Sequence, residues 1–492
     1  MISLGFWNLI VVILVAYVLK GNWRLDDEKI LWQDSIFLQN IFIHKLTQFC
    51  RKPIVNFALQ AIIVLLVSRL VIYAGWLFYL LNQSDPPLWD FKWFYTASKL
   101  AHQHLSPFNV EIFQQGFCNF TKACGSIPPF VYPPNIIPLI WFLGYFPINI
   151  AFTIWTVMHV IAIGLVLWGA NILLESRSPA LRNICTIAVA LLFGLIFDLQ
   201  TGNVATFIAV LLLWMLIFAK KDGNIAGGFC LGIALFKPTL AILFIPYLLL
   251  KRRFSLVLTS LITASLLGII GLVLTGNSVT EFLQDAARGV PLWLNDPSNN
   301  PYISISRIDL RVIGPRFFPN NTFLAKLFSD LIVLVLLGLG CWYWYQKQLQ
   351  TAWSKTIFLP EIALIFCLSI AISYSQPTSS VMLVPAVVFL INDLLFQIRY
   401  SSFSWGRTSV WVGGIAGLLI QTKFINGWLL GSLANNWDWK KGELPYILKV
   451  TIFTLPSYAV LGITLSVLVL AITSLRQLKA VRVASPKEKY EL

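Results

Sequence analysis

The stretch Val55–Tyr95 reads VNFALQAIIVLLVSRLVIYAGWLFYLLNQSDPPLWDFKWFY and passes from a long apolar span into a polar loop. A helix needs about 20 apolar residues to cross the roughly 30 Å of hydrocarbon in a membrane, and the part up to Leu81 offers that length. The loop that follows, about Gln83 to Pro129, places Asp90 among aromatic side chains. Charge in or near hydrocarbon is unfavourable and usually marks a pathway or a reaction centre. Asp90 is therefore the first candidate for the chemistry.

The composition extends this pattern to the whole chain. Hydrophobic residues make up 58% of the 492 residues and charged residues 12%, and the mean hydropathy is +0.76, which is typical of an integral membrane protein. We predict an all-α polytopic membrane protein with roughly 13 transmembrane helices. Residues 1–492 form a single transmembrane domain in this prediction, because no segment between the spans is long enough to bury an independent core. The first span, about Ile2 to Leu19, lacks a basic leader and a small-residue cleavage site, which indicates a retained helix.

The net charge of +15 comes from Lys and Arg residues that lie mostly in short segments between the apolar spans. The positive-inside rule places such segments in the cytoplasm. They are interpreted as topology determinants and contacts for anionic membrane lipids, and no nucleic-acid partner is expected. This topology makes 476–492 a cytoplasmic tail and places two long loops, 82–129 and 275–325, on the outer side. We expect the first outer loop to be the catalytic one.

Two apolar segments do not fit a single straight helix. Residues 130–174 must make one net crossing although they are long enough for two, and they are broken at Tyr145–Pro147. Residues 225–250 lie between two basic loops, and we predict two half-helices broken at Lys237–Pro238, because proline removes a backbone hydrogen bond and the freed groups need a polar partner. The Lys237 ammonium suits an anionic partner such as a lipid phosphate. The alternative is a lysine that extends along a half-helix to the membrane surface.

Other polar groups fall on the same predicted outer side, and each has an ordinary structural alternative. The helix that carries Asp90 and Tyr95 is otherwise an aromatic anchor at the interface, and Tyr132 is an interfacial tyrosine beside two prolines. The segment Gln200–Asn203 is otherwise a hairpin turn, since Gly and Asn tolerate left-handed backbone. Arginines on an outer face run against the positive-inside rule and favour an anionic ligand; they are Arg288, Arg307, Arg311 and Arg316.

Cysteine and histidine spacing predicts no metal site. Cys118 and Cys124 share the Asp90 loop, where they form a local disulfide if that loop faces an oxidising compartment. His102 and His104 would point to nearly opposite faces of a helix with no third ligand at a suitable spacing, so they are interpreted as exposed loop histidines. His159, inside a span, is interpreted as hydrogen-bonded within the bundle. Motifs for nucleotide, serine or zinc hydrolysis are missing, and the sequence supports neither a metal nor another cofactor.

The order of these elements resembles glycosyltransferase family 87, a branch of the C-type membrane glycosyltransferases that use lipid-phosphate sugars. The resemblance rests on an ordered set of motifs: Asp90 with Phe94-Tyr95-x-Ala97, Leu105-Ser106-Pro107-Phe108, Tyr132-Pro133-Pro134, Gln200-x-Gly202-Asn203, Phe236-Lys237-Pro238 and Lys251-Arg252-Arg253. It covers about Asp90 to Phe254. The C-terminal half resembles the family mainly in its hydropathy pattern and in Ser375-Gln376-Pro377. Family members tend to have a histidine or another polar group after that late turn, where this chain has Thr378-Ser379-Ser380.

The resemblance implies a C-type glycosyltransferase-like bundle that transfers a hexose, typically mannose, with inversion. The donor would be a polyprenyl-phosphate-linked sugar, the acceptor a lipid or glycan, and Asp90 the general base for the acceptor hydroxyl. The donor phosphate would be held by Lys237, Arg288, Arg307 and Arg311. The sugar or acceptor would be bound by Tyr95, Tyr132, Gln200 and Asn203. We expect an integral protein of the plasma (inner) membrane with its site facing outward.

Two other functions stay open. A lipid-linked sugar flippase or a secondary transporter often shows paired repeats and acidic residues at mid-membrane, whereas most acids here fall in loops or near span ends, with Glu361 and Asp393 nearest an apolar interior. A polysaccharide ligase or polymerase would use the same outer face, with its key charges mainly from arginine and histidine.

Overall fold

The computed structural model describes residues 89–124, 127–174, 179–302, 304, 307–350, 358–400, 405–421 and 455–473, and every regular element in them is a helix. The predicted spans before residue 89 and the predicted tail 476–492 lie outside these residues. Five described helices are long and apolar enough to cross a membrane: Ile148–Leu173, Phe254–Thr275, Thr322–Leu349, Pro377–Leu394 and Leu455–Thr473. An all-helical polytopic membrane protein is therefore confirmed, while the number of crossings stays a prediction.

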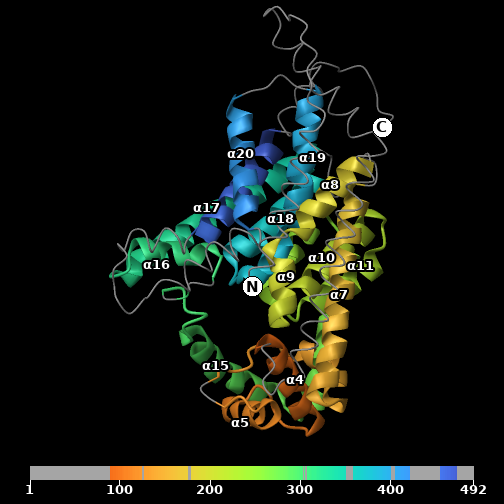
Figure 1. The fold of residues 1–492 in the computed structure, drawn as a ribbon, viewed down its shortest axis with the longest axis vertical. Coiled ribbons are helices and arrows are strands. Elements are labelled where there is room, and N and C mark those ends of the chain that lie inside the picture. Colours follow the sequence, from red (N-terminus) through yellow and green to blue (C-terminus); the bar gives the residue numbers. More distant parts are fainter. Residues whose placement is uncertain are drawn as a thin grey trace, which may run out of the picture.

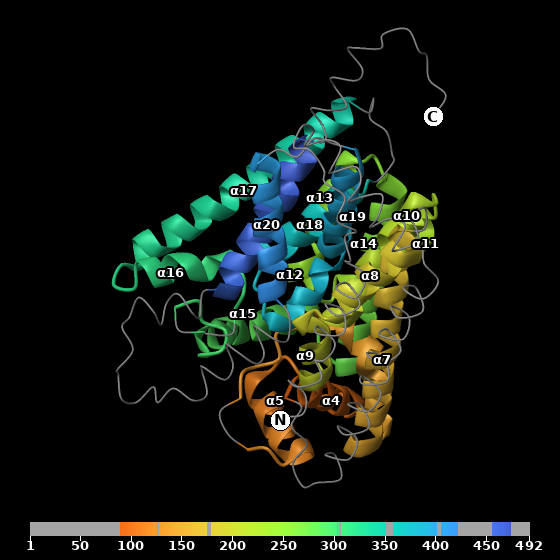
Figure 2. The ribbon, with the colours of Figure 1, turned by 45° about the horizontal axis from the view of Figure 1, so that its top comes forward.

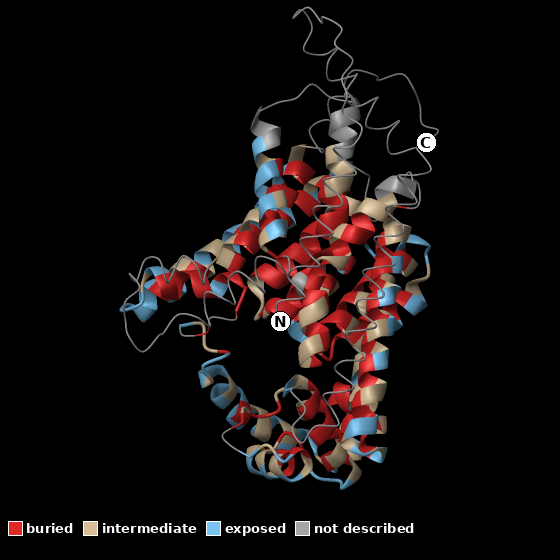
Figure 3. Cartoon of the chain, in the orientation of Figure 1, coloured by how far each residue is buried: buried red, intermediate tan, exposed pale blue. Residues whose placement is uncertain are grey.

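The helices form an elongated bundle with α4 (Trp89–His102), α5 (Val110–Thr121) and α15 (Val279–Asn295) at one end (Figure 1). Buried residues run through its middle (Figure 3), where α18 (Leu359–Ile372) is buried from Glu361 to Ala371. The other α-helices are α6 (Ile137–Ile140), α7 (Ile148–Leu173), α8 (Pro179–Ala190), α9 (Phe193–Thr201), α10 (Ala205–Lys220), α11 (Asn224–Ala234), α12 (Pro238–Ala241), α13 (Phe244–Leu250), α14 (Phe254–Thr275), α16 (Ile313–Phe317), α17 (Thr322–Gln350), α19 (Val384–Tyr400) and α20 (Trp405–Ile420). Short 3-10 helices are η1 (Pro134–Ile136), η2 (Trp141–Tyr145), η3 (Leu310–Val312) and η4 (Pro377–Leu383).

Several basic loops meet at the end of the bundle away from α4 and α5 (Figure 2). Arg253 Nη1 lies 2.6 Å from Asp222 Oδ1, which joins the loops after α10 and α13. The fully buried pair Lys251 and Glu361 is 2.7 Å apart and links α13 to the start of α18. Lys347 Nζ of α17 lies 4.4 Å from the ring centre of Phe358 in the same region. Among the described residues, the predicted cytoplasmic loops after α10 and α13 and the end of α17 therefore lie at one end of the bundle.

Residues 224–250 enter the bundle and return to the same end, as a re-entrant hairpin of α11, α12 and α13. The ion pair between Asp222 and Arg253 brackets this hairpin at its base. The predicted break at Lys237–Pro238 is confirmed, and Pro238 occupies the first turn of α12, where its missing N–H has no helical partner to lose. Lys237 is at the tip of the hairpin, between α11 and α12.

Small residues let α11 lie directly on α14. A Cβ atom added at Gly228 would be 2.5 Å from Thr259 Cβ, and one added at Gly232 would be 2.5 Å from Thr263 Cβ. Two glycines four positions apart are a common means of close helix approach in membranes. This packing fixes the inward-running half of the re-entrant hairpin against a membrane span.

The break predicted at Tyr145–Pro147 is also confirmed: η1, α6 and η2 come first, and α7 then begins at Ile148. The short helices support α4, because Ser98 Oγ donates to the Trp141 carbonyl oxygen at 2.9 Å. The prediction of an exposed loop histidine is wrong for His102, which lies in the last turn of α4 and stacks on the Trp141 ring at 4.7 Å. His104 is exposed, as predicted.

The two long outer loops contact each other at the α4–α5 end. Ser106 Oγ and Asn109 Nδ2 both donate to the Asp285 carboxylate, at 3.1 Å and 3.3 Å. A disulfide joins Cys118 and Cys124 at the end of α5. The α4–α5 connection and α15 therefore support each other at this end of the bundle.

Candidate active site

A tight turn between α9 and α10 forms the base of the candidate site. Gly202 ends α9 in the left-handed conformation, with φ 70°, and its N–H donates to the Asp198 carbonyl oxygen at 2.8 Å. A Cβ atom at this position would lie 2.7 Å from Phe91 Cβ of α4. Glycine therefore supplies both the backbone conformation and the space that lets α4 lie on the turn.

Helix α7 and the buried Asp198 hold this turn in place. Trp155 Nε1 donates to the Gly202 carbonyl oxygen at 2.9 Å, and His159 Nε2 lies 2.6 Å from the Asn203 carbonyl oxygen. The prediction that His159 is hydrogen-bonded within the bundle is thus confirmed. The Asp198 carboxylate accepts from the Thr206 N–H at 2.7 Å and so caps the start of α10. The side chain of Asn203 is consequently presented from a rigid support.

Asn203 connects two charged side chains that are far apart in the sequence. Its Nδ2 donates to Asp90 Oδ2 at 2.9 Å, and its Oδ1 accepts from Lys237 Nζ at 3.0 Å. Asp90 comes from the first turn of α4, Asn203 from the α9–α10 turn, and Lys237 from the tip of the re-entrant hairpin. The amide therefore stands between a carboxylate and an ammonium, with one hydrogen bond to each.

The environment of Asp90 acts on its acidity in two directions. Burial raises the pKa of Asp90, because a carboxylate loses solvation away from water. The hydrogen bond from Asn203 and the positive charge of Lys237 lower the pKa of the same carboxyl and oppose that effect. A carboxyl balanced in this way is suited to exchange a proton with a bound hydroxyl.

The three side chains face a cavity of about 530 Å³. One wall, which we call the Lys237 wall, is made by α4, the segment before η1, the α9–α10 turn and the hairpin tip. Its residues include Trp89, Asp90, Trp93, Phe94, Tyr132, Asn203 and Lys237. Lys237 is the one cationic side chain that lines the cavity among the described residues. Tyr132 packs against Phe94 with ring centres 5.1 Å apart. This wall combines a carboxylate, an amide, an ammonium and aromatic rings.

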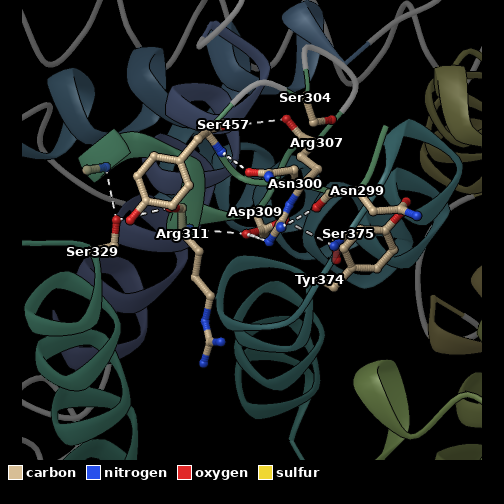
Figure 4. A network of polar contacts seen from close by, with 12 residues as sticks. Asn299, Asn300, Ser304, Arg307, Asp309, Arg311, Ser329, Tyr374, Ser375 and Ser457 are labelled. Carbon is tan, nitrogen blue, oxygen red and sulfur yellow. Dashed lines mark hydrogen bonds and ion pairs between the residues drawn. The ribbon is translucent and has the colours of Figure 1, made fainter. Parts of the chain in front are cut away.

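A second part of the lining, which we call the Tyr374 wall, comes from the end of α15, the loop after it, the segment before η4 and the first turn of η4. Its cavity-lining residues are Val290, Trp293, Asp296, Ser298, Asn299, Tyr374, Gln376 and Ser379. Tyr374 Oη donates to Asn299 Oδ1 at 2.5 Å, and the Trp293 and Tyr374 rings meet at 4.5 Å between centres. Behind them Arg307 forms a two-pronged ion pair with Asp309 (Figure 4), at 2.9 Å and 2.7 Å.

The structure separates the arginines that we predict to hold phosphate. Arg288 is exposed on α15 and does not line the cavity. Arg307 is 3% exposed and also lies behind the cavity lining. The side chain of Arg311 is exposed and extends away from the Asp309 network (Figure 4). Lys237 is the predicted phosphate ligand that reaches the cavity.

The predicted sugar-binding residues divide in the same way. Tyr132 and Asn203 line the cavity with Asp90. Tyr95 is buried on α4, where its hydroxyl donates to the Phe146 carbonyl oxygen at 3.1 Å, and Gln200 lies on α9 outside the cavity lining. These two side chains therefore do not line the cavity.

Sequence reasoning did not identify Trp293, Asp296 and Tyr374 as site residues. The nearest signal in the sequence was the late turn Ser375–Pro377, which directly follows Tyr374 and contributes Gln376 to the Tyr374 wall. No group of three or more His, Cys, Asp or Glu side chains suited to a metal ion lies together within the described ranges. The groups that the cavity offers to a ligand are therefore carboxylate, amide, hydroxyl, ammonium and aromatic ones.

Comparison with known proteins adds one match. The family model for Glycosyltransferase family 87 matches residues 130–368. That range contains Asn203, Lys237 and the α15 part of the Tyr374 wall, and it begins after Asp90 and ends before Tyr374. A search of curated proteins finds no significant match to the chain.

Proposed function

The chain belongs to glycosyltransferase family 87 and is a membrane glycosyltransferase, and from this we propose that it transfers a hexose, in the first place mannose, from a polyprenyl-phosphate donor to a lipid or glycan acceptor. The observation that carries the proposal is the hydrogen-bonded series Asp90, Asn203 and Lys237 at the cavity surface. The Asp90 carboxylate can accept a proton and the Lys237 ammonium can bind a phosphate, and one bound substrate could contact both groups.

In the proposed reaction the acceptor hydroxyl attacks the anomeric carbon of the donor sugar. Asp90 takes the hydroxyl proton as the new bond from oxygen to the anomeric carbon forms. The bond between that carbon and the phosphate oxygen breaks at the same time, and attack from the opposite side inverts the anomeric centre. The leaving group departs as polyprenyl phosphate, so no acid is needed to protonate it, unlike the leaving group of a glycoside hydrolase.

Lys237 is the proposed ligand of the departing phosphate, where it would balance the charge that develops. The Asn203 amide lies between Asp90 and Lys237, with one hydrogen bond to each. It would hold the carboxylate in place for the acceptor hydroxyl and the ammonium in place for the donor phosphate. Tyr132 and the neighbouring rings of the Lys237 wall would contact the transferred sugar.

The proposed location is the plasma (inner) membrane with the cavity facing outward. The disulfide between Cys118 and Cys124 lies in the same outer loop as Asp90, and disulfides persist in oxidising compartments. The basic loops gather at the opposite end of the bundle, which suits a cytoplasmic end.

The test is transfer of radiolabelled mannose from polyprenyl-phosphate-mannose into membrane lipids and glycans. We expect the Asp90→Asn variant to fold and to transfer at a rate reduced about 100-fold or more, the usual scale for loss of a general base. Glu111→Gln is the matched control, because Glu111 is an exposed carboxylate of the same outer loop. Near-normal transfer by Asp90→Asn would remove Asp90 from the role of base. No transfer by the wild type from any lipid-linked sugar would overturn the function and favour a flippase or transporter.

A further inference from the structure

The two walls of the cavity differ in charge. The Lys237 wall carries an ammonium beside Asp90, whereas the Tyr374 wall contributes a second carboxylate, Asp296, and no cation among the described lining residues. Among the described lining residues, Lys237 alone can therefore compensate an anionic group of a ligand. A second anionic group in the cavity would be repelled by the carboxylates of Asp90 and Asp296. Juxtaposed like charges are a strong means of rejecting a wrong partner.

Arg307 does not alter this charge balance. Its Nε and Nη2 donate to the two carboxylate oxygens of Asp309, and its Nη1 donates to the Asn299 carbonyl oxygen at 2.8 Å. The Tyr374 ring covers the guanidinium at 5.0 Å from its centre. Asp309 thus compensates the positive charge behind the wall, and Arg307 is suited to shape the wall instead of holding a phosphate.

The side chain of Asn299 orients the two aromatic rings. Its Oδ1 accepts from the Tyr374 hydroxyl, and its Nδ2 donates to the Trp293 carbonyl oxygen at 3.0 Å. The Tyr374 ring is thereby held against Trp293, and both rings line the cavity beside Asp296 and Gln376. Rings with an apolar body beside a few fixed polar groups form the usual chemistry of a site for a neutral, hydroxylated ligand.

We infer that the Tyr374 wall is the acceptor subsite and that it selects an uncharged sugar residue as the acceptor. Trp293 and Tyr374 contact that residue, and Asp296 disfavours an acidic or phosphorylated one. Charge elsewhere in the acceptor molecule, away from the receiving residue, is compatible with this selection. The inference rests on the proposed function, in which the donor phosphate occupies the Lys237 wall.

The experiment compares two acceptors of equal chain length, neutral octyl mannopyranoside and anionic octyl glucuronide, with labelled polyprenyl-phosphate-mannose and the purified full chain. We expect wild type to prefer the neutral glycoside by about tenfold or more in kcat/KM. Asp296→Asn should reduce this preference to within about threefold, because the like charge is gone. Glu281→Gln is the control: it removes a charge from the same helix, and glutamine can keep the capping box with Ser278. Its preference should equal that of wild type.

A second variant separates acceptor from donor. Trp293→Ala should raise the acceptor KM by about tenfold and leave the donor KM unchanged, since the aromatic contact is lost only for the acceptor. Equal use of both glycosides by wild type, an unchanged preference in Asp296→Asn, or a donor-specific defect in Trp293→Ala would each overturn the inference while transfer itself persists. If neither octyl glycoside accepts labelled mannose and only membrane acceptors do, the sugar residue that received the mannose is identified. A neutral residue supports the inference, and an acidic or phosphorylated residue overturns it. Absence of all transfer overturns the proposed function instead.

Discussion

Asn203 Nδ2 donates to Asp90 Oδ2 across 2.9 Å, although the two residues are 113 positions apart in the chain. The same amide accepts from Lys237, so one side chain sets the distance between the proposed base and the proposed phosphate ligand. Its own position depends on Gly202, His159 and Asp198 beneath it. Substitutions in this series should therefore have separable effects on proton transfer, on donor use and on folding.

The first prediction concerns pH. A general base must be deprotonated, so transfer falls as pH falls through the pKa of Asp90. The Asn203 hydrogen bond lowers that pKa, and Asn203→Ala should raise it and move the acid limb of the pH–rate profile to higher pH. Initial rates of sugar transfer across pH 4 to about 9 measure the shift. Asn149→Ala, at an exposed asparagine of α7, should leave the limb in place; an unmoved limb in Asn203→Ala contradicts the role of Asp90 as the titrating base.

The second prediction concerns the donor. Lys237→Gln removes the one cation that lines the cavity among the described residues, and we expect the donor KM to rise at least about tenfold while the acceptor KM changes little. Lys237→Arg should recover part of the loss, because it retains the charge. Lys326→Gln, an exposed lysine of α17, is the control. An unchanged donor KM in Lys237→Gln would contradict the role of phosphate ligand and favour the alternative, a lysine that extends along a half-helix to the membrane surface.

Much of the fold was predictable because it depends on local properties of the chain. Long apolar runs indicate membrane spans, and the prolines at 147 and 238 stand at the two breaks that we predict, since proline disfavours continuation of a helix. The breaks at Tyr145–Pro147 and Lys237–Pro238 are found where these residues stand. The second interruption of the re-entrant hairpin, between Ala241 and Phe244, was not predicted, although Pro246 stands in the first turn of α13 and cannot donate to the Ile242 carbonyl oxygen.

The candidate site was predictable only in part, because its walls join segments that are distant in the sequence. Outer-side placement suggested that Asp90, Asn203 and Lys237 could meet, but their hydrogen bonds depend on how α4 packs on the Gly202 turn. The four outer-loop arginines looked equivalent in sequence. Arg307 differs because Asp309 follows two residues later, and in extended backbone residues two apart lie on the same side. That spacing was the available signal for an internal ion pair instead of a ligand site.

The third prediction concerns the pair behind the Tyr374 wall. Arg307→Ala leaves the Asp309 carboxylate buried without its cation, and removal of one partner of a buried pair lowers stability by about 3–5 kcal/mol. The double variant Arg307→Gln with Asp309→Asn should recover a large part of that loss, because neither residue is then charged. Melting temperature of the purified protein in detergent measures both. Arg311→Ala, at the exposed neighbour, should melt like wild type; equal melting of Arg307→Ala and Arg311→Ala would contradict a structural ion pair.

The last prediction concerns the contact between α4 and the α9–α10 turn. Gly202→Ala places a methyl group 2.7 Å from Phe91 Cβ and puts alanine at φ 70°, a backbone conformation that L-residues rarely adopt. The backbone strain alone is of order 1–3 kcal/mol, and the steric clash pushes α4, with Asp90 on it, away from Asn203. We therefore expect both a lower melting temperature and a fall in kcat greater than the loss of folded protein explains. Gly164→Ala is the matched control in α7, where an added Cβ meets no atom within 4 Å. If Gly202→Ala loses stability but keeps the wild-type kcat per folded molecule, the geometry between Asp90 and Asn203 does not limit transfer.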